Sequence, residues 1–220
     1  MKINSYAKIN LGLHVLDKRV DGFHNITTIF QEIDFYDQLT IEKSKTMIFD
    51  TNATWLDATN NTCISAIEIL KQHHPDLPNF KIFLQKNIPT NAGLGGGSSN
   101  GTAILKGINQ LCSLNIQEKE MKKLAEKISA DSTFFVDGGM QGAEEKGQKL
   151  YPIKNIQLDN YILLIMPDIK VQTSEAFMFI KKYLVKGETH IKLSQMLEEL
   201  KLKNLSSELF YNDFEMHVFK

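Results

Sequence analysis

A glycine-rich stretch near the middle of the sequence carries the clearest chemistry. Residues 89–100 read Pro-Thr-Asn-Ala-Gly-Leu-Gly-Gly-Gly-Ser-Ser-Asn, which places four glycines in five positions. Glycine lacks the Cβ that would block a positive φ and a close approach, so successive backbone N–H groups can curl around an anion. A helical pattern follows over 101–111, and a helix N-terminus adds a partial positive charge. The stretch therefore predicts a phosphate-binding loop that opens onto a helix, with Ser98 and Ser99 at the cap.

Two better-known glycine loops do not fit this stretch. A Walker A loop ends in Gly-Lys-Ser/Thr, whereas Gly97 is followed here by Ser98. A dinucleotide fingerprint, Gly-x-Gly-x-x-Gly, begins correctly at Gly93 but meets serine at its third glycine position. A flexible linker is a further alternative, but linkers rarely lie between a strand-like segment, here 81–84, and a clean helical pattern.

Two charged residues outside the loop could take part in such a site. Lys8 lies on the alternating segment 2–16, beside Asn10, where a lysine could equally face solvent. Asp131 comes shortly after two expected helices that begin at the glycine loop. It could fold back onto the loop, or it could cap a turn, a role that aspartate often fills. The residues alone leave both alternatives open for each side chain.

Aromatic and imidazole side chains occur together at two other places. Phe23 and His24 follow a turn signal at Asp21-Gly22, where they could hold a flat ligand, although a partly buried loop histidine is commoner. The adjacent His73 and His74 suggest a metal site. Consecutive helical residues point about 100° apart, however, and no nearby cysteine or carboxylate pattern completes one. We therefore expect no metal centre there.

The composition excludes several classes of protein. Of 220 residues, 42% are hydrophobic, which is ample for a core, and the formal net charge is -1 with a pI near 6.6. This balance gives no argument for a nucleic-acid or membrane partner. The two cysteines have no metal or redox spacing, and no stretch approaches 18 apolar residues. We expect a cytoplasmic protein.

Periodicity predicts a mixed succession of strands and helices. Strands are expected at 2–16, 26–34, 39–42, 47–49, 80–84, around Gly142, at 147–151 and at 161–166, the last as a buried strand. Helices are expected from a cap at Thr62 to about His73, over 101–111 and 117–128, from a cap at Thr173, over 190–201 and from Asp213 onward. The pattern of residue types changes near residue 155, where we expect the boundary between two domains.

Four separated segments together resemble the GHMP small-molecule kinases, and within them the branch that acts on 4-diphosphocytidyl-2-C-methyl-D-erythritol. The segments are Tyr6-Ala7-Lys8-Ile9-Asn10-Leu11, Asp21-Gly22-Phe23-His24, the glycine loop, and Ala130-Asp131 with Phe134-Phe135. The resemblance continues to Asn212-Asp213-Phe214-Glu215. It implies an α+β GHMP kinase fold, with a nucleotide-binding domain like the second domain of ribosomal protein S5 over 1–155 and a second α+β substrate domain over 156–220.

The resemblance also implies roles at the phosphate-transfer end of the site. Asp131 would accept the proton of the substrate's 2-hydroxyl as it attacks the γ-phosphorus of ATP, and Lys8 would hold hydroxyl and phosphate in line. Mg²⁺ would lie near Ser98 or Ser99. The ATP phosphates would be held by Pro89, Thr90, Asn91, Ala92, Gly93, Leu94, Gly95, Gly96, Gly97, Ser98 and Ser99, with adenine near Asn61 and Lys86.

At the other end of the substrate, the resemblance implies a site for cytosine. Phe23 matches a position usually held by tyrosine, and Phe177 matches another aromatic, so the two rings could sandwich the base. His24 would read its polar edge, and Asn10 and Thr173 would complete the substrate contacts.

Two departures from the family pattern stand out. Relatives normally have Val-Pro after the catalytic aspartate, whereas this chain has Ser132-Thr133, so the turn loses a proline constraint. Relatives also carry a third glycine- and serine-rich motif after the Asn-Asp-Phe-Glu region, and this sequence stops at Lys220. We therefore expect an incomplete second domain with an exposed sheet edge, and a monomer or weak homodimer.

The sequence is compatible with three functions. The first is an ATP-dependent kinase for the cytidyl-methylerythritol substrate. The second is a truncated, inactive relative that binds nucleotide or acts as an interaction partner. The third is a GHMP kinase for another small alcohol, such as mevalonate or homoserine. The third predicts indifference to Phe23→Ala and His24→Ala, because those substrates have no base to stack.

Overall fold

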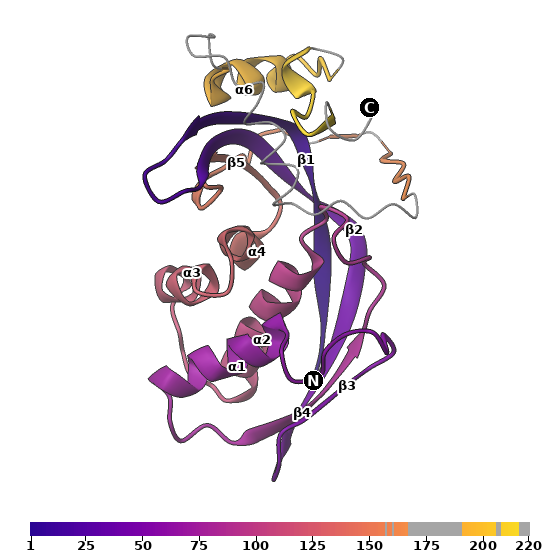
Figure 1. Ribbon diagram of the computed structural model, residues 1–220, viewed down its shortest axis with the longest axis vertical. Helices are drawn as coiled ribbons and strands as arrows, with labels where there is room; N and C mark the ends of the chain where they lie inside the picture. Colours follow the sequence, from indigo (N-terminus) through magenta and orange to yellow (C-terminus); the bar gives the residue numbers. More distant parts are fainter. Residues whose placement is uncertain (157, 160, 167–190, 206–207, 216–220) are drawn as a thin grey trace. The chain divides into compact units, whose positions relative to one another are not determined.

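The computed structural model of the chain describes residues 1–156, 158–159, 161–166, 191–205 and 208–215. Contacts between residues divide it into two compact units that interleave along the sequence (Figure 1). The first unit comprises residues 1–8, 32–90 and 94–138, and the second comprises 9–31, 91–93 and 139–220. The domain boundary expected near residue 155 stays a prediction.

Two long, paired strands contribute residues to both units. Strand β1 spans Lys2–Lys18 and strand β2 spans His24–Ser44. The segments expected at 26–34 and 39–42 are therefore one continuous strand, and that part of the prediction was wrong. The residues between the two segments continue the hydrogen-bonded ladder, which local periodicity does not show.

The sheet of the first unit is built on the C-terminal half of β2. This half pairs antiparallel with β4 (Asn79–Gln85), in a register that places Ile41 opposite Ile82, and β3 (Ile48–Thr51) pairs with β4 in parallel. In β4, Phe80, Ile82 and Leu84 are buried while Lys81 and Phe83 are exposed. This alternation gives the sheet one apolar face.

Helices cover this apolar face (Figure 1). They are α1 (Thr62–His73), α2 (Gly96–Leu111) and α3 (Glu118–Glu126), with α1 and α2 side by side. Residues such as Leu70 and Ile104 from the helices share one core with Ile82 from the sheet. The first unit then ends in a 3₁₀ turn, η1 (Ala130–Thr133), and the short helix α4 (Phe134–Asp137).

The second unit contains other strands of the same continuous sheet and has its own core. The N-terminal half of β2 pairs antiparallel with β5 (Met140–Glu145), and β5 pairs with β6 (Lys149–Pro152). Helix α6 (Leu193–Lys201) packs on β5, because Gly142 has no side chain and leaves room for Leu193. A short 3₁₀ turn, η2, spans Glu208–Phe210.

Several expected elements are confirmed, and three further expectations, besides the division of β2, were wrong. The strands at 2–16, 47–49 and 80–84 and the helices at 117–128 and 190–201 are present, with ends shifted by a few residues. The cap of α1 is Asn61 rather than Thr62, since the Asn61 side chain accepts hydrogen bonds from the amides of Cys63 and Ile64. Helix α2 begins at Gly96, with Gly95 as its cap, so Ser98 and Ser99 lie in its first turn instead.

The third wrong expectation is the buried strand at 161–166. This run has no regular secondary structure, and its side chains are exposed except for the half-buried Leu164, with Leu163 at 83% and Ile165 at 82%. A strand needs a hydrogen-bonded neighbour, and within the described residues none pairs with it. The helix expected from Thr173 lies outside the described residues, as does most of the one expected from Asp213. Among the helices that the structure does describe, none is long and apolar enough to cross a membrane.

Candidate active site

The glycine loop enters α2 through a left-handed turn. Gly93 has φ +73° and Gly95 has φ +68°, a conformation that costs glycine little. A Cβ on Gly95 would lie 2.8 Å from the Phe135 ring and 3.2 Å from Cγ of Lys8, so a side chain has no room there. The first N–H groups of α2 lack an acceptor within their own helix and are suited to hold an anion.

Lys8 and Asp131 meet beside this turn. Their Nζ and Oδ2 atoms are 3.6 Å apart, and the exposed fraction of the side chain is 8% for Lys8 and 36% for Asp131. The Lys8 amide also donates to the carbonyl oxygen of Leu94 at 3.0 Å, which holds β1 against the loop. The first unit thus brings a buried ammonium and an accessible carboxylate together beside Leu94 and Gly95, at the end of the loop that leads into α2.

Hydroxyl groups connect the turn that carries Asp131 to the first turn of α2. Ser129 Oγ donates to Ser98 Oγ at 2.8 Å, and it lies 2.7 Å from Ser132 Oγ. Thr133 Oγ1 donates to the carbonyl oxygen of Ala130 at 3.4 Å. The two residues that replace Val-Pro therefore hold η1 by hydrogen bonds.

A buried ion pair lies behind the loop. Lys86 Nζ is 2.6 Å from Asp37 Oδ2, and their side chains are 4% and 0% exposed. The other oxygen, Asp37 Oδ1, accepts the amides of Asn87 and Ile88 at 2.6 and 2.8 Å. The ammonium of Lys86, expected near adenine, is thus engaged inside the protein and also donates to the Ile88 carbonyl.

The same network reaches the start of α2. Asn100 Nδ2 donates to Asp37 Oδ2 and to Ser5 Oγ, each at 2.9 Å, and Ser5 Oγ donates to Ser99 Oγ at 2.8 Å. Ser99 is 3% exposed. Its hydroxyl faces this network, whereas the Ser98 hydroxyl is only half-buried. Of the two serines considered for Mg²⁺, Ser98 is therefore the better placed.

Asn61, the other residue expected near adenine, serves the start of α1. Besides capping the helix, its Nδ2 donates to the carbonyl oxygen of Asp57 at 2.8 Å. The neighbouring Thr62 donates to the carbonyl oxygen of Gly97 at 2.6 Å. Through this bond the start of α1 lies against the glycine loop.

The residues expected to bind cytosine fall in the second unit or outside the described residues. Phe23 is 60% exposed, with Lys146 Nζ 5.2 Å from its ring centroid, and the half-buried His24 begins β2. Asn10 Nδ2 donates to Thr28 Oγ1 at 2.9 Å. Thr173 and Phe177 lie outside the described residues.

Sequence reasoning missed the residues that support the loop. Asp37 stands within a strand and Ser5 near the start of another, and nothing in their local pattern marks them. Asn100 stands out in the sequence only as the last residue of the glycine motif. Ser129 and Ser132 flank Asp131, and that proximity was the one available signal.

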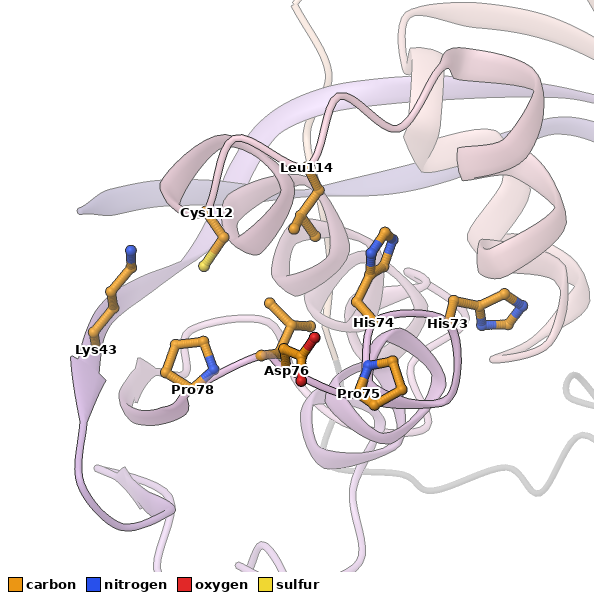
Figure 2. A pocket seen from close by; sticks show the side chains of 9 residues that line it. Lys43, His73, His74, Pro75, Asp76, Pro78, Cys112 and Leu114 are labelled. Carbon is orange, nitrogen blue, oxygen red and sulfur yellow. The ribbon is translucent and has the colours of Figure 1, made fainter.

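A cavity elsewhere in the first unit does not involve these residues. Its volume is about 410 Å³, and both adjacent histidines are among the residues that line it (Figure 2). Its lining residues are Lys43, His73, His74, Pro75, Asp76, Leu77, Pro78, Cys112 and Leu114. His73 is bonded through Nδ1 to the carbonyl oxygen of Ile69. Within the part of the chain that the structure describes, no cluster of three metal-binding side chains occurs.

The residues of the glycine loop fit a nucleotide polyphosphate. A Cβ on Gly93 would meet no described atom within 4 Å, and one on Gly97 would meet only Thr62, at 3.7 Å, so the backbone there is open to close approach. Mg²⁺ in kinases is usually held by the phosphates and one or two protein groups, which does not require a dedicated cluster. The half-buried Ser98 hydroxyl is one group of that kind.

Comparison with known proteins agrees with this geometry. The family model of the GHMP kinases N terminal domain matches residues 61–139. The 4-diphosphocytidyl-2-C-methyl-D-erythritol kinase of Persephonella marina is 34% identical over 212 residues, covering 94% of this chain and 77% of the relative. The enzyme of the same name from Parabacteroides distasonis is 38% identical over 215 residues, covering 97% and 77%.

Solved structures share the fold. A crystal structure of 4-(cytidine 5'-diphospho)-2C-methyl-D-erythritol kinase superposes with a TM-score of 0.78 at 24% identity, over 100% of this chain and 77% of that one. The mevalonate kinase of Methanococcus jannaschii gives a TM-score of 0.62 at 15% identity, over 94% and 73%. The α+β GHMP kinase fold is thereby confirmed. By its similarity to these relatives over nearly its whole length, the chain belongs to the 4-diphosphocytidyl-2-C-methyl-D-erythritol kinase family of the GHMP kinases.

Proposed function

We propose that the chain transfers the γ-phosphoryl group of ATP to the 2-hydroxyl of 4-diphosphocytidyl-2-C-methyl-D-erythritol, a step of non-mevalonate isoprenoid precursor synthesis. The observation that supports this most strongly is the 3.6 Å approach of Lys8 Nζ to Asp131 Oδ2 beside the glycine loop. Family membership supports the choice of substrate, because both relatives described above carry the name of this kinase.

The proposed chemistry needs a base and a positive charge at one place. The substrate oxygen attacks the γ-phosphorus, its proton passes to the Asp131 carboxylate, and the bond from the γ-phosphorus to the β–γ bridging oxygen breaks to release ADP. Lys8 is buried, so its ammonium acts in surroundings of low dielectric constant. There it stabilises the negative charge on the transferring group and holds the hydroxyl in line.

The glycine loop and the start of α2 hold the phosphates in this proposal. The amides of Gly96, Gly97 and Ser98 lie at the positive end of the helix dipole. Mg²⁺, when bound with ATP, would neutralise charge on the β- and γ-phosphate oxygens, and Ser98 is the side chain proposed to assist it.

Recognition of cytosine is assigned to the second unit. Phe23 offers an exposed ring, which a base can stack on without unfolding its surroundings. His24, Asn10, Thr173 and Phe177 remain the other proposed contacts. The contact of Lys146 with the Phe23 ring would be exchanged for stacking with the base.

The test is ADP release by the purified chain with Mg-ATP, with and without the cytidyl-methylerythritol substrate. Release should depend on this substrate, and Asp131→Asn should lower kcat by roughly 10²- to 10⁴-fold, the usual contribution of a general base. Asp131→Asn should still bind a non-hydrolysable ATP analogue, since the phosphate loop is unchanged.

Other outcomes would favour the rival functions. Binding of the analogue without any turnover would favour a nucleotide-binding relative that has lost activity. Turnover of mevalonate or homoserine, unaffected by Phe23→Ala and His24→Ala, would favour a kinase for another alcohol. Either result would overturn the proposal.

A further inference from the structure

Three serine hydroxyls form a hydrogen-bonded chain between the two halves of the candidate active site. Ser132 and Ser129 belong to the turn around Asp131, and Ser98 belongs to the first turn of α2. Ser129 Oγ donates to Ser98 Oγ at 2.8 Å and lies 2.7 Å from Ser132 Oγ. Ser132 is fully buried, while Ser129 and Ser98 are half-buried.

The chain of hydroxyls has a direction. A serine hydroxyl has one proton to donate, and Ser129 uses its proton on Ser98. Ser132 must therefore donate in the bond that it shares with Ser129; its other acceptor, the carbonyl oxygen of Ser98, is farther away at 3.4 Å. The proton of Ser98 is not needed in this chain and can be donated elsewhere.

A second contact fixes the same two segments. Thr102, also in α2 and fully buried, places its Oγ1 3.0 Å from the carbonyl oxygen of Ser98 and 2.9 Å from that of Ser132. The turn that carries Asp131 is thus bonded to the start of α2 at two separate places. A shift of one segment would disturb the other.

We propose that Ser129 and Ser132 are positioning residues, which orient Asp131 and direct the proton of Ser98 to a phosphate oxygen of the bound nucleotide. This inference rests on the proposed function, because it takes the phosphates to lie at the start of α2. Hydrogen bonds in such a series strengthen one another, and an anion at Ser98 makes the last bond charge-assisted. The bound nucleotide thereby stabilises the geometry in which Asp131 accepts the substrate proton.

The test compares Ser129→Ala, Ser132→Ala and Ser129→Thr with the wild-type chain. Each Ala variant should lower kcat and weaken binding of a non-hydrolysable Mg-ATP analogue by roughly three- to tenfold, the usual worth of one hydrogen bond. Ser129→Thr retains the hydroxyl in an extended backbone conformation that threonine tolerates, so it should restore both values to within about twofold of wild type.

A merely structural role would give a different result. Ser44 is a half-buried serine at the end of β2, whose Oγ accepts a hydrogen bond from the Thr46 amide, and Ser44→Ala serves as the matched control. If the variants lower Tm as Ser44→Ala does while kcat and analogue affinity stay at wild-type values, or if Ser129→Thr fails to restore them, the inference is wrong.

The two proposals fail separately. A wild-type chain that turns over the substrate and Ala variants that do so equally well would overturn the serine chain alone. A wild-type chain without turnover would overturn the proposed function. In that case, analogue affinity decides the serine chain: a loss in Ser129→Ala that Ser129→Thr reverses supports it, and equal affinities overturn it.

Discussion

At the scale of single residues, burial decides what each charged side chain can do. Lys8 and Lys86 are both buried lysines of the first unit, yet their partners differ. Lys86 is bonded to the fully buried Asp37, whereas Lys8 faces the more accessible Asp131. The pair of Lys86 and Asp37 can therefore stabilise the fold, whereas the pair of Lys8 and Asp131 remains accessible to a substrate.

Replacing Lys8 should separate turnover from binding. We expect Lys8→Met to lower kcat by roughly 10²- to 10³-fold, the loss typical of removing one preorganised charge-stabilising group. KM for ATP should change much less, because the loop amides remain. Steady-state kinetics with both substrates varied would measure this, and a large rise in KM at constant kcat would contradict the role assigned to Lys8.

Replacing Lys86 should act on stability. Lys86→Met leaves the buried carboxylate of Asp37 without its cation, a change that costs about 3–5 kcal/mol in typical proteins. We expect the lower end of that range, since Asp37 keeps hydrogen bonds from Asn87, Ile88 and Asn100. Adding Asp37→Asn should recover part of the loss.

Denaturant unfolding would measure these changes, with the exposed Lys81→Met as the matched control. The control should change the free energy of unfolding by no more than about 0.5 kcal/mol. A loss for Lys86→Met as small as that would show that the buried pair contributes little.

Cys63 should be unreactive in the folded protein. Burial raises the pKa of its thiol from 9.0 to about 12, with the nearby charge of Asp37 adding to the effect. At pH 8 a thiol reagent should label Cys63 only after unfolding, because the thiolate is the reactive form. Mass spectrometry of the labelled peptides in buffer and in denaturant would show it; rapid labelling of native Cys63 would contradict it.

The same pKa shift makes stability depend on pH. The folded thiol keeps its proton to higher pH than the unfolded thiol, so its contribution is complete below about pH 9 and is lost as the pH rises from 9 towards 12. Cys63→Ala should reduce the fall in the free energy of unfolding over that interval. The comparison of slopes is informative even if the substitution lowers stability at every pH.

At the scale of elements, the junction between the glycine loop and α2 is the most constrained. Gly95→Ala and Gly93→Ala impose the same left-handed strain, about 1–2 kcal/mol. Only Gly95→Ala adds a clash, with the ring of Phe135. We expect Gly95→Ala to destabilise the protein by about 1–3 kcal/mol more than Gly93→Ala, the usual cost of overpacking. Equal values from denaturant unfolding would show that the ring moves away freely.

The sequence predicted those elements whose signal is local. In β4 the alternation of Ile82 with Lys81 and Phe83 marks a half-buried strand, and the helical spacing of Met121 and Leu124 marks α3. The apolar run 161–166 carries an equally strong local pattern. It is not a strand, because pairing depends on a neighbour that the run itself does not specify.

The candidate site divides in the same way. The glycine loop was predictable from its own residue types, whereas the roles of Lys8 and Asp131 followed only from the family resemblance and stay predictions. The hydrogen-bonded network that supports the loop could not be predicted from the sequence. Asp37 accepts hydrogen bonds from residues 49 and 63 positions away, and no local pattern encodes such partners. Helix propensity also could not predict that α2 begins at two glycines, Gly96 and Gly97. A Cβ on Gly96 would lie 2.9 Å from Ile88, so close packing decides that helix start.

At the scale of the whole molecule, the two units have separate cores. Ile82 and Leu70 belong to the core of the first unit, and Leu193 and Met196 to that of the second. The proposed nucleotide site draws most of its residues from the first unit, and the described cytosine contacts come from the second. Ligands for the two sites should therefore protect different parts of the chain.

Hydrogen exchange measures this protection residue by residue. A non-hydrolysable Mg-ATP analogue at about 100 times its Kd stabilises the folded state by about 2.7 kcal/mol. We expect the largest gain in protection at α2, β4 and η1. Cytidine diphosphate, tested on its own, should add protection chiefly around His24 and the N-terminal half of β2, and Phe23→Ala should remove that gain.

The pattern of protection distinguishes two ways in which the chain can hold its ligands. Gains confined to one unit for each ligand would mean that each core opens separately, so that each ligand stabilises its own site. Equal gains in both units from the analogue alone would contradict this expectation, because both cores would then open only together. In that case a substitution in either core, such as Met196→Ala, should weaken nucleotide binding as well.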